Sequence, residues 1–86
     1  MQVEAALVKE QGLTFAVVVV KRHVTGSPLT ARDAIAGYAS YWPGVPVVLM
    51  SQGGDGTPTF YGRPDIVRFL KDVPVEALPW GQWQLN

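Results

Sequence analysis

The chain has 86 residues, with seven basic and seven acidic side chains, so its formal net charge is zero. This length is that of one small domain, and the charge balance counts against nucleic-acid binding, which usually requires a basic surplus to neutralise phosphates. The chain has no cysteine and one histidine, which excludes disulfides and thiolate chemistry within it and argues against a zinc site, so we expect no metal and no cofactor.

The first half of the chain predicts two strands and a helix. Residues 2–9 alternate between apolar and polar side chains, as in a strand with one solvated face. Residues 13–20 are apolar on both faces, which is typical of a central strand. Ser27-Pro28 offers an N-cap followed by a first-turn proline, and apolar residues at helical spacing over 31–42 predict the helix that follows.

The second half repeats this pattern of two strands and a helix. Residues 45–50 are again apolar on both faces, and residues 57–61 predict a strand at a sheet edge because Pro58 cannot donate a ladder hydrogen bond. Pro64 opens the last helix, which ends before Pro74. We therefore expect a single α/β (α+β) domain over 1–74, with a four-stranded mixed or antiparallel sheet in ββαββα order and both helices on one face.

The tail, residues 75–86, carries two indole side chains that would be costly to leave in water. Trp80 and Trp83 predict that the tail docks on the domain or on a partner chain, and we take both as interface residues. Two helices on one face leave the other face of the central strands uncovered. We expect the tail, a second copy of the chain, or both to cover it.

Residues 44–72 resemble the C-terminal half of a thioredoxin-like domain. The resemblance rests on the Val45-Pro46 step, a hairpin turning at Asp55-Gly56, a glycine that closes the second strand, and a helix with a Phe-Leu pair. In that family the Val-Pro step contains a cis proline and the first helix begins with Cys-x-x-Cys. Here Thr25-Gly26-Ser27-Pro28 occupies that position, so the resemblance implies the scaffold without the dithiol chemistry.

One candidate ligand site lies where the second strand meets the first helix. Arg22, His23, Thr25 and Ser27 follow a central strand and precede a helix N-terminus, a junction that binds anions in many α/β proteins. We expect residues 44–46 to form the other side of this mouth. The alternative is a solvated strand end followed by an ordinary helix cap.

No catalytic motif is visible, and we assign no catalytic residue. Residues 53–56 are glycine-rich but lack the Gly-Lys-Ser/Thr ending of a phosphate-binding loop, and no Gly-x-Ser-x-Gly elbow is present. His23 has no evident carboxylate partner along the sequence.

The leading hypothesis is a small non-catalytic binding or assembly protein that acts as a homodimer, with another protein as a further partner. Zero net charge favours self-association because it leaves little electrostatic repulsion between copies. The alternative is a small-molecule or anion-binding protein, enzymatic or regulatory, with its site at the junction described above. The apolar runs are too short to span a bilayer and Glu4 replaces a basic leader segment, so we expect a cytoplasmic protein with no membrane partner.

Overall fold

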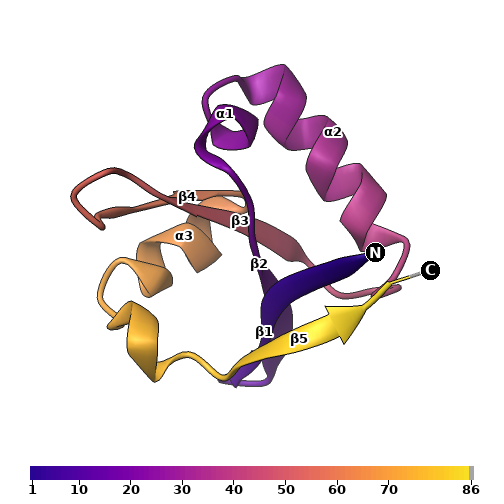
Figure 1. Cartoon of the computed structure of the whole chain (residues 1–86). Coiled ribbons are helices and arrows are strands. Elements are labelled where there is room, and N and C mark those ends of the chain that lie inside the picture. Colours follow the sequence, from indigo (N-terminus) through magenta and orange to yellow (C-terminus); the bar gives the residue numbers. More distant parts are fainter. Residues whose placement is uncertain (86) are drawn as a thin grey trace.

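The computed structural model describes residues 1–85 and shows an α+β domain with a five-stranded mixed sheet (Figure 1). The elements in chain order are β1 Gln2–Glu10, β2 Leu13–Val19, α1 Arg22–Thr25, α2 Pro28–Ala39, β3 Val47–Gln52, β4 Pro58–Tyr61, α3 Pro64–Leu70, the 3₁₀ turn η1 Val75–Ala77, and β5 Trp80–Gln84.

The strands lie in the order β4-β3-β2-β1-β5. β1 pairs antiparallel with β2 and β5, β3 pairs antiparallel with β4, and β2 runs parallel to β3 through the crossover that contains α1 and α2. The sheet is therefore mixed, one of the two predicted alternatives. The prediction of four strands in ββαββα order is not confirmed, because the tail supplies β5 at the edge beside β1 and a short α1 precedes α2.

Both faces of the sheet are covered by this chain itself. One apolar cluster packs α1 and α2 against Ala5, Val18 and Leu49, and a second packs α3 and η1 against Ala6 and Val17 on the opposite face. The prediction of both helices on one face is wrong, since α3 crosses to the other side after β4. The expected uncovered face is therefore occupied within residues 1–85, and it gives no reason to expect a second chain.

Gly62 closes the turn between β4 and α3 at a point where no larger residue fits. A Cβ atom at this position would lie 2.8 Å from Val48 Cγ2, which is inside van der Waals contact. The absence of a side chain lets the backbone pass directly over β3 and carries the chain to the second face. This close approach helps to place α3 where the sequence pattern did not.

None of the helices within residues 1–85 is long and apolar enough to cross a membrane. The hairpin and the helix implied by the thioredoxin-like resemblance are present as β3, β4 and α3. The Val45–Pro46 peptide bond is trans, however, where the resemblance implied a cis proline.

Candidate functional site

A pair of hydroxyl side chains joins α1 to the carboxyl end of β3. The Thr25 and Ser51 oxygens lie 2.7 Å apart, and the Thr25 hydroxyl donates to the Arg22 carbonyl at 3.2 Å. Either hydroxyl can donate in the bond between the two side chains. Ser51 is only 2% exposed and is the one buried polar side chain within residues 1–85, so this pair satisfies a buried hydroxyl.

The four residues of the predicted ligand site do not converge. Arg22 and His23 are exposed on the short α1, while Thr25 turns inward to Ser51. Ser27 is the N-cap residue of α2, but its side chain makes no capping hydrogen bond. Of the four, His23 lines a cavity at this end of the sheet.

The predicted mouth between residues 23–27 and residues 44–46 is wrong. β2 and β3 are parallel, with Ala16 opposite Val47 and Val19 opposite Met50. Parallel pairing places the start of β3 beside the start of β2, whereas residues 23–27 follow the end of β2. The two segments therefore lie at opposite ends of the sheet.

A cavity of about 430 Å³ lies at the end of the sheet where β1 begins and β2 ends. Valines of β1, β2 and α1 supply apolar lining, and the polar side chains are those of Gln2, Glu4, Lys21, His23 and Tyr38. Because side chains alternate along β1, the Glu4 carboxylate projects on the α3 side of the sheet, with Ala6, whereas α1, which carries His23, packs on the other side. Of these lining residues, His23 belongs to the ligand site expected from the sequence, whereas those of β1 and α2 reach the cavity only through the fold.

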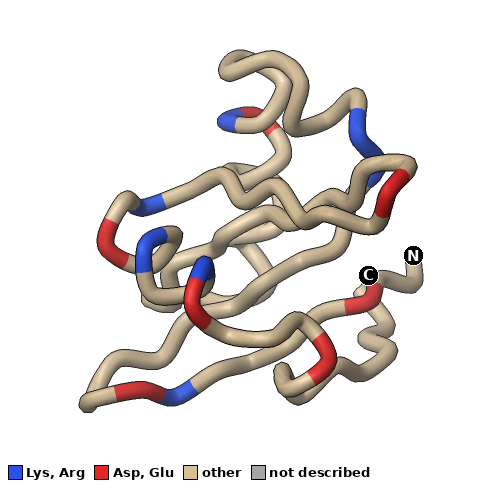
Figure 2. Tube along the Cα trace, turned by 90° about the vertical axis from the view of Figure 1, so that its left-hand side faces the viewer, with Lys and Arg blue, Asp and Glu red and all other residues tan. Residues whose placement is uncertain are grey.

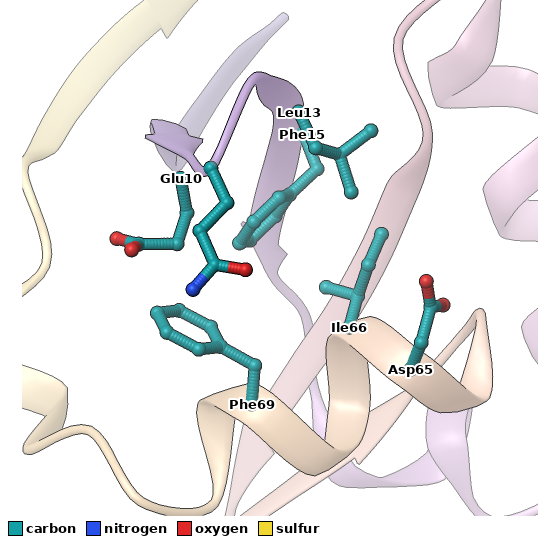
Figure 3. A pocket seen from close by; sticks show the side chains of 7 residues that line it. Glu10, Leu13, Phe15, Asp65, Ile66 and Phe69 are labelled. Atoms are coloured by element: carbon teal, nitrogen blue, oxygen red, sulfur yellow. The ribbon is translucent and has the colours of Figure 1, made fainter.

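A second cavity, of about 300 Å³, lies at the opposite end of the sheet between the β1–β2 turn and α3. Figure 3 shows Phe15 and Phe69 facing each other there, with Glu10 and Asp65 on either side. The two rings pack edge to face with centroids 6.3 Å apart. This cavity was not predicted, because its walls come from a hairpin and a helix that are distant along the chain.

The carboxylate of Asp65 in this second cavity is already engaged. Arg63 donates from Nε and Nη2 to its two oxygens, both at 2.8 Å, and this hydrogen bonding lowers the pKa of Asp65 to about 2. An ionised carboxylate held by a guanidinium is a poor proton acceptor near neutral pH. This cavity therefore offers apolar contact and no free acid–base group at Asp65.

The two predicted interface tryptophans pack within the chain on opposite faces of β5. Trp80 belongs to the cluster under α3, and its indole N–H donates to the Val75 carbonyl at 2.8 Å. Trp83 lies on the other face, where its indole N–H donates to the Ala5 carbonyl at 3.2 Å and its ring meets Trp42 edge to face, with centroids 5.5 Å apart. Both indoles remain partly exposed. They attach β5 to the domain, and neither needs a second chain to bury most of its surface.

Among the strands of the described chain, β5 has a neighbour on one side only (Figure 1). Met1 and Leu85 exchange two backbone hydrogen bonds, at 2.9 and 2.7 Å, which fixes them as a hydrogen-bonded pair. Since such pairs alternate in an antiparallel ladder, Trp83 and Gly81 face β1, whereas the N–H and C=O groups of Gln82 and Gln84 point outward. An open row of backbone donors and acceptors is a ready template for another strand.

Two further observations limit what the site can do. No group of three or more His, Asp or Glu side chains within residues 1–85 is arranged to hold a metal ion. Figure 2 shows basic and acidic positions interspersed along residues 1–85.

Comparisons with known proteins find no family model, no curated protein and no solved structure that matches this chain. The thioredoxin-like resemblance of residues 44–72 therefore has no support beyond its generic hairpin and helix.

Proposed function

We propose that this protein is a small non-catalytic assembly protein that acts as a homodimer. The observation that supports it is the open outer side of β5, where the backbone groups of Gln82 and Gln84 point away from the sheet. Zero net charge adds to this, because two copies meet without long-range repulsion. The support is thus a sheet edge, and not the sheet face that α3 covers.

The arrangement of polar side chains favours assembly over catalysis. Thr25 and Ser51 satisfy each other, Arg63 engages Asp65, and His23 is exposed on α1 without a hydrogen-bonded carboxylate that would orient it. Catalysis by a serine or a histidine needs a nucleophile and a base within hydrogen-bond reach, and ideally a third group that orients the base. The described residues do not form such a constellation.

The molar mass in solution tests this proposal. We expect size-exclusion chromatography with light scattering to give twice the chain mass at tens of micromolar, falling toward the single-chain mass on dilution. The midpoint of that change gives the dissociation constant. A single-chain mass throughout this range would overturn the homodimer.

The second candidate function is binding of a small anionic molecule in the cavity of about 430 Å³. Lys21 and His23 line this cavity beside an apolar floor, which suits an apolar molecule that carries one carboxylate or phosphate. Glu4 also lines the cavity, but its position on β1 is in phase with Ala6 on the face that α3 covers, so we place the anion beside Lys21 and His23.

Thermal shift measurements separate the two candidates. If the cavity binds anions, benzoate or inorganic phosphate raises the melting temperature of the wild-type chain in proportion to ligand occupancy. The Lys21→Gln variant loses that rise, while Lys71→Gln on the far side of the sheet keeps it. No rise with either probe in the wild-type chain would remove this second candidate.

A further inference from the structure

The outward groups of β5 are spaced so that one copy of the strand can satisfy another. Gln82 and Gln84 each present one N–H and one C=O, two residues apart, on the side away from β1. In an antiparallel ladder, hydrogen-bonded pairs recur every second residue on each strand. Two identical strands can therefore exchange four hydrogen bonds if Gln82 of one faces Gln84 of the other.

We infer that the dimer forms by antiparallel pairing of β5 with β5 of a second copy, with Gln82 opposite the partner's Gln84 and the two-fold axis at Trp83. This inference rests on the proposed homodimer and names its interface. The axis at Trp83 makes the patch self-complementary, as a two-fold interface requires. The result is one continuous ten-stranded sheet built from two five-stranded ones.

The side chains of β5 favour a second copy over a charged partner. The strand reads Trp-Gly-Gln-Trp-Gln and carries no charge, so it offers no complement to a basic or acidic peptide. The amides of Gln82 and Gln84 can hydrogen-bond to each other across the new ladder. At the axis, Trp83 meets the partner's Trp83 at a non-hydrogen-bonded position, where cross-strand side chains lie closest. Each indole is already partly exposed for that contact.

A lysine pair tests the interface by repulsion. In the Gln82→Lys/Gln84→Lys variant, lysines of the two copies lie directly opposite each other twice, which destabilises a ladder. We expect the dissociation constant to rise roughly tenfold or more by sedimentation equilibrium. The matched control is Thr59→Lys, an exposed position on the opposite sheet edge, which leaves the constant unchanged.

A complementary variant restores the dimer. When Gln84→Glu is mixed with the lysine pair, its new carboxylate lies opposite the lysine that the partner carries in place of Gln82. We put the glutamate at 84 because Gln82 lies opposite Glu4 within its own chain, where a second carboxylate would repel it. We expect the mixed dimer to form more tightly than the lysine-pair dimer. Equal dissociation constants for the mixed dimer and the lysine-pair dimer would contradict this interface.

Disulfide trapping tests the register. The chain has no cysteine, so Gln82→Cys and Gln84→Cys each introduce one thiol. The inferred register brings 82 and the partner's 84 to a hydrogen-bonded pair, within the Cα separation that a disulfide spans, whereas 82 and the partner's 82 are diagonal neighbours that lie too far apart. We expect mild oxidation to link a mixture of the two variants and to leave each variant alone largely unlinked.

The outcomes separate the two proposals. A wild-type chain that stays monomeric at tens of micromolar would overturn both the homodimer and its interface. The outer edge of β5 would then be open to a strand of another protein. A dimer that persists in the lysine pair with an unchanged dissociation constant keeps the proposed function and overturns this interface. Rapid linking of Gln82→Cys with itself overturns the register.

Discussion

The two edges of this sheet are built differently. On β4, the bond from Gly53 N–H to the Thr57 carbonyl at 3.0 Å fixes the alternation, so Thr59 and Tyr61 face β3 while Pro58 and Phe60 point outward. Pro58 has no N–H, which leaves Phe60 as the only outward donor of that strand. On β5, by contrast, both outward residues are glutamines with a free N–H and C=O.

This difference bears on which edge of the sheet is used in the proposed self-association. A proline and a short strand are common devices that block pairing at a sheet edge, as are charges. β4 has four residues and a proline, whereas β5 has five residues with neither proline nor charge. We therefore expect changes at β5 to alter both stability and mass in solution, and changes at β4 to alter stability alone.

Removing β5 is expected to have the largest effect on stability. Deletion of residues 79–86 removes the pairing of β1 with β5 and both indole contacts. We expect a loss of about 5 kcal/mol or more, which is comparable to the whole free energy of unfolding of a small domain. Circular dichroism then shows an unfolded chain at room temperature. A truncated chain that keeps its melting temperature and its mass would show that β5 contributes nothing.

Truncating one aromatic side chain on each edge strand tests whether the two edges differ. Trp83→Ala removes an indole hydrogen bond and the contact with Trp42, and we expect a loss of about 3 kcal/mol in urea unfolding. Phe60→Ala on β4 removes a partly exposed ring from the opposite cluster, and we expect a loss of about 1–2 kcal/mol. Only Trp83→Ala is expected to weaken the dimer. Equal effects on mass from both variants would contradict the difference between the edges.

The edge position of Pro58 was predictable because proline has a fixed chemical consequence for a ladder. The burial of residues 15–18 and 47–50 on both faces was also predictable, since apolar runs without polar alternation require it. The face covered by α3 was not, because the amphipathic pattern of a helix says which side is buried and nothing about which sheet face it meets. The close approach of Gly62 to Val48 just before α3 is likewise a tertiary contact, which the sequence pattern does not contain.

The tail and the candidate site show the same limit. Two indoles predicted docking, but they could not predict a strand, because Trp-Gly-Gln-Trp-Gln lacks the β-branched pattern of the other strands. For the ligand site, Arg22, His23, Thr25 and Ser27 are close in sequence but point in different directions around a short helix. The hydrogen-bond partner of Thr25, Ser51, comes from β3, and the residues that line a cavity with His23 come from β1, β2 and α2.

The hydroxyl pair near the β4 edge gives a smaller, local effect. Ser51 lies opposite Thr59 of β4 and bonds to Thr25 of α1, so it joins that helix to the protected side of the sheet. Thr25→Val leaves the Ser51 hydroxyl buried without its partner, and we expect a loss of about 1–2 kcal/mol. Adding Ser51→Ala recovers part of this loss, which a double-mutant cycle measures. Strictly additive losses would mean that the two hydroxyls do not interact. The mass in solution stays unchanged in each variant.

The smallest expected effect concerns Asp65, at the start of the helix that follows β4. Arg63 lowers its pKa to about 2, below the ordinary value of 3.8. Because the folded-state pKa is depressed, the ion pair stabilises the folded chain above about pH 4, and this stabilisation is lost as the pH falls toward 2. Asp65→Asn therefore has a lower melting temperature than the wild-type chain at pH 7, and the two melting temperatures converge near pH 2.

The side chains of Arg63 and Asp65 are at least half exposed, so salt reduces this difference in melting temperature. Arg63→Gln produces the same convergence, and we expect neither change to alter the mass in solution, since the pair lies outside the proposed β5 interface. A difference between Asp65→Asn and wild type that persists at pH 2 would show that the asparagine perturbs the start of α3 for some reason other than charge.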